Sequence, residues 1–237
     1  MNYQIVKCEE TFNRFLEWLP ELEDGQKFYF SLFARKKYGA TEGLKADKCQ
    51  LKRFTASKEQ ALNKIKKLEV ELGSYEIEGL KINQDSLVLY ATANPRDMHK
   101  AGLKTAKELI SMVADGRTIY NPQSVALNQI QVTGIKKYFD IDLDLKEGQE
   151  LSHLNLWNVI LDNDLINSTA INGNIIKTRG GYHILVELDK ISEPYKKKWF
   201  NNFSQLKDER FTIMMNGDNM TPVPGCVQSD FVPYLIS

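Results

Sequence analysis

The chain has few of the residues that build zinc sites or disulfides. It contains three cysteines and three histidines among 237 residues. The cysteines, Cys8, Cys49 and Cys226, lie far apart and form no Cys-x-x-Cys pair. A zinc site made of cysteines is therefore not expected, and a disulfide framework still less. The histidines are equally dispersed, which argues against histidine-rich metal chemistry.

The sequence also lacks long apolar runs and low-complexity segments. No apolar stretch is long enough to span a bilayer, and residues 1–10 show no apolar core of a secretory signal. We therefore expect a cytoplasmic protein without a membrane partner. No internal repeat and no linker rich in proline, glycine or serine divides the chain, and 42% of its residues are hydrophobic. This composition is typical of a folded chain with a substantial core.

Charge of neither sign predominates. There are 31 basic and 31 acidic residues, whereas a protein that binds nucleic acid through bulk charge alone is usually basic. The charge is uneven, because basic side chains gather in residues 35–53 and acidic ones in residues 140–150. Candidates to contact a nucleic-acid backbone are Lys36, Lys37, Lys52 and Arg53. Ordinary solvated surface is the alternative interpretation of this cluster.

Helices and strands are expected to alternate along the chain. Apolar spacing and capping residues predict helices over residues 11–19, 57–72, 104–114, 155–164 and 193–206. Strands are predicted over residues 28–34, 86–92, 137–145, 170–177, 182–188, 210–215 and 232–236, and residues 125–133 are ambiguous. The pattern restarts near residue 134. We therefore expect an α+β fold with mixed α/β layering, in which an N-terminal α/β module (residues 1–134, with the basic cluster) and a second module (residues 135–237) form one integrated globular domain.

Alternating aspartates mark the strand predicted at residues 137–145. Side chains alternate between the faces of a strand, so Asp140, Asp142 and Asp144 point one way and the apolar residues between them point the other. Neighbouring carboxylates repel one another unless a divalent cation lies between them. Mg²⁺ and Mn²⁺ take oxygen ligands, and Mg²⁺ is commonly completed by phosphates and water. The pattern predicts a metal site, and the polar face of an ordinary strand is the alternative.

A glycine turn precedes the next apolar strand, in the segment Thr-Arg-Gly-Gly-Tyr-His. Gly180 and Gly181 permit backbone conformations that bring N–H groups close to an anion. Lys177 and Arg179 add positive charge, and arginine suits bidentate contacts with phosphate. His183 is then placed to donate a hydrogen bond to a triphosphate oxygen. A hairpin turn followed by a histidine with internal partners is the alternative.

A third acid follows the strand predicted at residues 210–215. Asp218 comes directly after a glycine, and its carboxylate is the preferred candidate to complete the metal site, with Asp208 and Asp230 as rivals. Arg96 lies on a turn after another predicted strand and is a further candidate to bind phosphate. A loop of turn residues is the alternative for the Asp218 segment.

The order of these motifs resembles that of the archaeo-eukaryotic primase superfamily, which includes replicative primase catalytic subunits and the primase-polymerases of plasmids and phages. Asp140 and Asp142 match its first motif, and Gly181-Tyr182-His183 its second. Asp218 is taken as the third, and the following Pro222-Val223-Pro224-Gly225 is similar to a Pro-Gly stretch of the family. The motifs cover residues 137–231. The arginine that the family often carries before this stretch is absent.

The resemblance implies a specific fold and activity. It implies an N-terminal α/β module packed on an RRM-like module, with the active-site cleft between them. It further implies nucleotidyl transfer in which Asp140, Asp142 and Asp218 hold Mg²⁺ or Mn²⁺ and His183 contacts the nucleotide. The expected partners are nucleoside triphosphates, a single-stranded DNA template and a separately encoded replicative helicase, in the setting of a mobile element.

Two other functions remain open at this stage. One is a catalytically inactive nucleic-acid-binding relative of the same fold, which zero net charge and the missing arginine allow. The other is a metal-dependent nuclease that uses the same acids. A fold by itself does not distinguish these three functions.

Overall fold

The computed structural model describes residues 1–117 and 121–236, and it has the α+β class expected from the sequence. Within these residues it contains seven α-helices, two five-stranded sheets and a small hairpin, β3 (Glu76–Ile77) with β4 (Leu80–Lys81). Every described pairing between strands is antiparallel. Short 3-10 turns occur at Lys36–Tyr38, Gln84–Ser86, Ser168–Ala170 and Leu188–Lys190.

The first sheet is built mainly from the N-terminal half of the chain. Its strands are β1 (Gln26–Arg35), β2 (Lys48–Ala56), β5 (Leu87–Thr92), β6 (Arg96–Asp97) and β11 (Met220–Pro222). They follow the order β11-β5-β1-β2, and β6 also pairs with β1. On one face, Phe28, Phe30 and Leu32 form a core with α1 (Glu9–Trp18) and α2 (Lys58–Lys66). On the other face, Tyr29 packs against a helical hairpin of α3 (Met98–Ala114) and α4 (Pro122–Gln131).

The second sheet comes from the C-terminal half. Its strands are β7 (Tyr138–Leu145), β8 (Ile175–Lys177), β9 (Gly181–Glu187), β10 (Phe211–Gly217) and β12 (Tyr234–Ile236), in the order β10-β7-β9-β8-β12. One face packs against α5 (His153–Asp162), α6 (Glu193–Lys196) and α7 (Trp199–Gln205). The alternation predicted for β7 is confirmed, because Ile141 and Leu143 lie in this core while Asp140, Asp142 and Asp144 do not.

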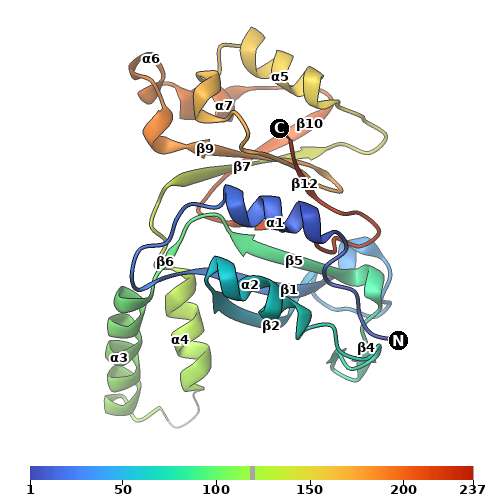
Figure 1. The fold of residues 1–237 in the computed structure, drawn as a ribbon, viewed down its shortest axis with the longest axis vertical. Helices are drawn as coiled ribbons and strands as arrows, with labels where there is room; N and C mark the ends of the chain where they lie inside the picture. Colours follow the sequence, from blue (N-terminus) through green and yellow to red (C-terminus); the bar gives the residue numbers. More distant parts are fainter. Residues whose placement is uncertain (118–120, 237) are drawn as a thin grey trace.

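Helix α1 lies between the two sheets, as Figure 1 shows. Its Phe12 and Phe15 belong to the core of the first sheet. Trp18, at its C-terminal end, packs on Tyr138 of the second sheet with ring centroids 5.2 Å apart. The indole Nε1 of Trp18 also donates a hydrogen bond to Asn174 Oδ1 at 2.9 Å. The helix therefore links the two sheets through both apolar and polar contacts.

The C-terminal part of the chain crosses between the sheets twice. After β10 the chain enters the first sheet as β11, and it returns to the second sheet as β12. Val223, Cys226 and Val227 consequently lie in the core of the first sheet. The boundary near residue 134 thus separates the residues of the two sheets only as far as β10.

The structure differs from the predicted elements in several places. The short strands β3, β4, β6 and β11 were not predicted, and the strand predicted over residues 170–177 covers only Ile175–Lys177. Strand β2 was not predicted, because its lysines mask an alternation in which Cys49 and Leu51 face the core of the first sheet. The single helix predicted over residues 193–206 is two short helices, and Lys198 at the break donates to Asp164 at 2.8 Å.

No helix in the described part of the chain is long and apolar enough to cross a membrane.

Candidate active site

The predicted catalytic segments meet in a cavity of about 120 Å³ between the two sheets. Its second-sheet wall, termed here the acidic wall, consists of Asp142, Asp144 and His183. Its first-sheet wall, the basic wall, consists of Arg35, Lys37 and Lys48. The cavity thus brings together residues that are about a hundred positions apart in the chain.

The acidic wall is set by the register of β7 and β9. Asp142 lies directly opposite His183, so the two side chains share a face of the sheet. The Nδ1 atom of His183 is 2.9 Å from Asp140 Oδ1, and its Nε2 atom is 3.6 Å from Asp142 Oδ1. Burial alone would lower the pKa of His183, but the carboxylates of Asp140, Asp142 and Asp144 outweigh it and raise the pKa to about 8. The imidazole therefore carries a proton over much of the neutral range.

Asp140 lies behind the histidine. Its side chain is buried, does not line the cavity and accepts the Nδ1–H of His183. Because this contact occupies Nδ1, the Nε2 atom is the nitrogen that faces Asp142. Asp140 therefore orients His183, whereas the sequence had suggested that it faces a metal.

The two aspartates in the cavity have the donor atoms that a hard cation needs. Burial and the neighbouring carboxylate of Asp142 both raise the pKa of Asp144. Asn216 donates to Asp142 Oδ2 at 3.3 Å. Across the described ranges, no three His, Cys, Asp or Glu side chains form a preformed metal-binding group. A divalent cation between Asp142 and Asp144 would relieve their repulsion, so the pair fits such an ion chemically.

The basic wall contains a buried guanidinium. Arg35 is only 5% exposed; its Nη2 donates to Asp47 Oδ2 at 2.7 Å and its Nη1 to the hydroxyl of Tyr90. Its Nε has no hydrogen-bond partner among the described residues. A buried donor without a partner is costly unless a ligand or water completes it. Together with Lys37 and Lys48, this donor makes the wall suitable for an anion.

An aromatic ring joins the basic wall to the glycine turn. The ring of Tyr38 has Arg35 and Lys37 each 5.9 Å from its centroid, and Arg179 at 5.3 Å. Such distances allow cation–π attraction, which holds three cations around one ring. Burial raises the pKa of Tyr38, so its hydroxyl stays protonated. Arg179 is also bound to Asp230 at 2.7 Å, at the exposed rim.

Lys177, Gly180 and Gly181, the other candidates of the glycine segment, have local roles in the second sheet. Lys177 lies on the opposite face of the sheet from His183, with its Nζ 4.1 Å from the centroid of the Tyr182 ring. Neither Gly180 nor Gly181 has a positive φ. A Cβ on Gly181 would lie 1.8 Å from the carbonyl oxygen of Leu143. This glycine is therefore required by the close approach of β9 to β7, and not by a left-handed turn around an anion.

Asp218 and Arg96 form an ion pair with each other. The Nη1 of Arg96 donates to Asp218 Oδ2 at 2.5 Å and its Nη2 to Oδ1 at 3.1 Å, while Asn94 donates to Oδ1 at 2.9 Å. Arg96 is 1% exposed, and neither residue lines the cavity. The pair holds the crossing from β10 to β11 against the first sheet. The rivals have arginine partners too, since Asp208 binds Arg210 and Asp230 binds Arg179.

The predicted nucleic-acid cluster is divided by the fold. Lys37 lines the cavity, and Lys36 beside it is exposed to solvent. Lys52 lies on edge strand β2 at another surface cavity. Arg53 donates to Asn128 Oδ1 of α4 at 2.6 Å. Sequence reasoning missed Arg35 as a site residue. The alternation of the aromatic strand β1 did indicate which face of the first sheet carries Arg35.

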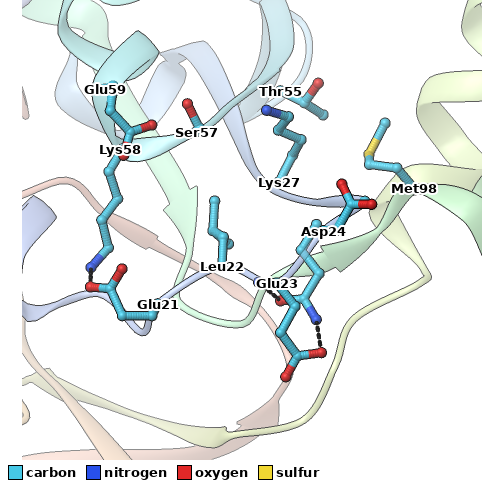
Figure 2. A pocket seen from close by; sticks show the side chains of 12 residues that line it. Glu21, Leu22, Glu23, Asp24, Lys27, Thr55, Ser57, Lys58, Glu59 and Met98 are labelled. Carbon is cyan, nitrogen blue, oxygen red and sulfur yellow. Dashed lines mark hydrogen bonds and ion pairs between the residues drawn. The ribbon is translucent and has the colours of Figure 1, made fainter.

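A larger cavity of about 570 Å³ lies between the loop before β1 and the start of α2 (Figure 2). Two of its acidic side chains, Glu21 and Glu23, are bound by other residues of the lining. Lys58 binds Glu21 at 2.5 Å, and Gln26 donates to Glu23 at 3.0 Å. None of the predicted motif residues lines it, so its size alone does not make it the active site.

Comparisons with known proteins assign no family to this geometry. No protein-family model matches the chain, and neither a curated protein nor a solved structure is significantly similar to it. The function therefore has to be inferred from the cavity and its two walls.

Proposed function

We propose that the protein is a metal-dependent nucleotidyltransferase resembling a primase-polymerase catalytic core, which acts on nucleoside triphosphates with a single-stranded DNA template. One observation carries the proposal. Carboxylates and a histidine on one sheet face Arg35, Lys37 and Lys48 on the other sheet across a small cavity. A metal-bound polyphosphate needs both walls, because the acids hold the cation and the bases hold the phosphate oxygens.

Asp142 and Asp144 are the residues that would hold Mg²⁺ or Mn²⁺. When bound, such ions stabilise the attacking and leaving oxygens of an in-line displacement at phosphorus. His183, protonated because its pKa is about 8, donates from Nε2 to a phosphate oxygen. Asp140 keeps the imidazole in that orientation by accepting a hydrogen bond from Nδ1–H.

The size of the cavity limits which part of the nucleotide it encloses. At about 120 Å³ it is well below the ~300–1,000 Å³ of sites that enclose drug-sized ligands. It therefore accommodates phosphate groups and metal, while sugar and base lie toward the open side. The basic wall then binds the triphosphate, a role that we assign to Lys37 in place of template contact.

The finer architecture belongs to the same proposal. An RRM-like character of the second module is supported by an antiparallel sheet with helices on one face and acids on the other. The template would cross the surface near Lys36, Lys52 and Arg53, and a separately encoded helicase would supply it. The setting of a mobile element is supported by the family resemblance alone.

A catalytically inactive nucleic-acid-binding relative is the second candidate. It is favoured by a specific observation, namely that Asp208, Asp218 and Asp230 each have an arginine partner. No third carboxylate among these candidates is then available for a second cation. This candidate predicts binding to single strands without metal affinity.

The test is template-dependent synthesis by the purified protein with Mn²⁺ or Mg²⁺ and labelled nucleotides. Asp142→Asn and Asp144→Asn should abolish the product, while Asp162→Asn, an exposed acid on α5, should not. Template binding without product in every preparation would support the inactive relative. Cleavage of labelled DNA in the absence of nucleotides would indicate a nuclease.

A further inference from the structure

The α3–α4 hairpin projects from the first sheet and carries an uncovered apolar face. Figure 1 shows the two helices side by side at one end of the molecule. A groove of about 390 Å³ runs between them, lined by small or apolar side chains such as Gly102, Ala106, Ala126 and Ile130. Thr105 is the polar side chain in this lining, and its hydroxyl already donates to the Ala101 carbonyl at 2.8 Å. The groove therefore suits an apolar occupant.

Large apolar side chains extend this groove over the outer surface of α3. Leu103, Ile110 and Val113 are 63%, 70% and 63% exposed. At helical spacing they lie next to Gly102 and Ala106, so groove and side chains form one continuous surface. A contiguous apolar surface on a projecting hairpin is typical of an interaction site.

One edge of the surface is basic. Lys100, Lys104 and Lys107 follow one another at helical spacing beside Leu103 and Ile110. None of the three forms an ion pair with any residue that the structure describes. The opposite edge is neutral, because α4 carries no charged residue. An occupant with carboxylates along one side would match this asymmetry.

We propose that this face binds an amphipathic helix of another protein, with its apolar side in the groove and its carboxylates along the lysine edge. A helix in a groove uses anchors at the spacing that this surface offers. Single-stranded nucleic acid fits less well, because neither helix carries Phe, Tyr or Trp for base stacking. A second copy of this chain fits less well too, because its own three lysines would repel those of the first and the face offers no unpaired acid to match them. The proposal is independent of the nucleotidyl transfer proposed above.

The test is selection of helical peptides, displayed on phage with randomised apolar and charged faces, against the full chain. Peptides that also bind a Leu103→Glu/Ile110→Glu variant are removed, so that the remaining ones depend on the α3 face. Leu154→Glu/Leu161→Glu on α5, which replaces two leucines that are 64% and 54% exposed, is the matched control. We expect enriched peptides to carry acids flanking apolar residues at helical spacing. Their affinity should fall about tenfold or more in the α3 variant and stay unchanged in the control.

A second variant tests the charge. Reversal of Lys100, Lys104 and Lys107 to glutamate should shift the selected peptides from acidic to basic. The proposal is overturned if the two proteins select the same charge, or if no peptide depends on Leu103 and Ile110. It is equally overturned if the face instead binds a single-stranded oligonucleotide or anionic vesicles, or makes a dimer that the α3 variant abolishes in sedimentation.

Discussion

Replacement of Asp218 by alanine is expected to lower the free energy of unfolding by about 3–4 kcal/mol. The variant leaves the guanidinium of Arg96 buried without its counter-charge, since Arg96 is 1% exposed and Asp218 is 21% exposed. Removal of one partner from a buried ion pair costs ~3–5 kcal/mol, and the partial exposure of Asp218 favours the lower end. Loss of one of the two acceptors of the Asn94 amide group adds ~1 kcal/mol.

This loss is large enough to measure by two methods. For a chain of this size it corresponds to a Tm lower by roughly 6–16 °C. Urea unfolding should show a lower midpoint with an unchanged slope. Asp230→Ala is the matched control, because the Arg179–Asp230 pair is exposed on both sides and such pairs contribute ~1 kcal/mol or less. The double variant Arg96→Met/Asp218→Ala should recover much of the loss, because it removes the unpaired charge as well.

The result that would refute this reasoning is specific. If Asp218→Ala unfolds at the wild-type urea concentration, the ion pair does not hold the crossing between the sheets. If the same variant also loses Mn²⁺ affinity, Asp218 is the third metal acid that the motif order suggested. Stability and metal binding together therefore decide between the two roles of one carboxylate.

Three further predictions concern the cavity and its strands. His183 has a pKa of about 8 against an ordinary 6.5, so its protonation should stabilise the folded state by about 2 kcal/mol below pH 6.5, and this contribution should be lost as the pH rises to 8. Urea unfolding of the metal-free protein across this range should show the decline. The variant His183→Gln should show a flatter dependence of stability on pH. Gly181→Ala should cost ~1–3 kcal/mol in the same assay, because its Cβ would meet the Leu143 carbonyl, and wild-type stability would contradict the close contact. Lys37→Gln should weaken the binding of a Mn²⁺-nucleotide about tenfold in calorimetry, whereas the control Lys52→Gln should leave it unchanged. Equal effects of the two variants would argue against binding of phosphate by the basic wall.

Local patterns predicted much of the fold and part of the candidate site. Strand alternation correctly separated the aspartates of β7 from its apolar core residues, because side-chain direction in a strand depends only on position along it. The hairpin of β8 and β9, and the place of His183 at its apolar strand, were within reach of the same reasoning. Strand β2 was not predicted, since charged residues on an edge strand mask the alternation. The break between α6 and α7 was not predicted either, and Lys198 at this break binds Asp164, which is distant in the sequence.

The amino-acid sequence by itself determined which residues share a strand face, because that depends on a period of two along the chain. Only the tertiary structure decided what each face meets. The packing of the two sheets sets Arg35 and Lys37 against Asp142 and Asp144, and the double crossing of the C-terminal segment gives Asp218 an arginine. Those contacts join residues about a hundred positions apart. Their geometry follows from how the cores pack around α1, which no local pattern encodes.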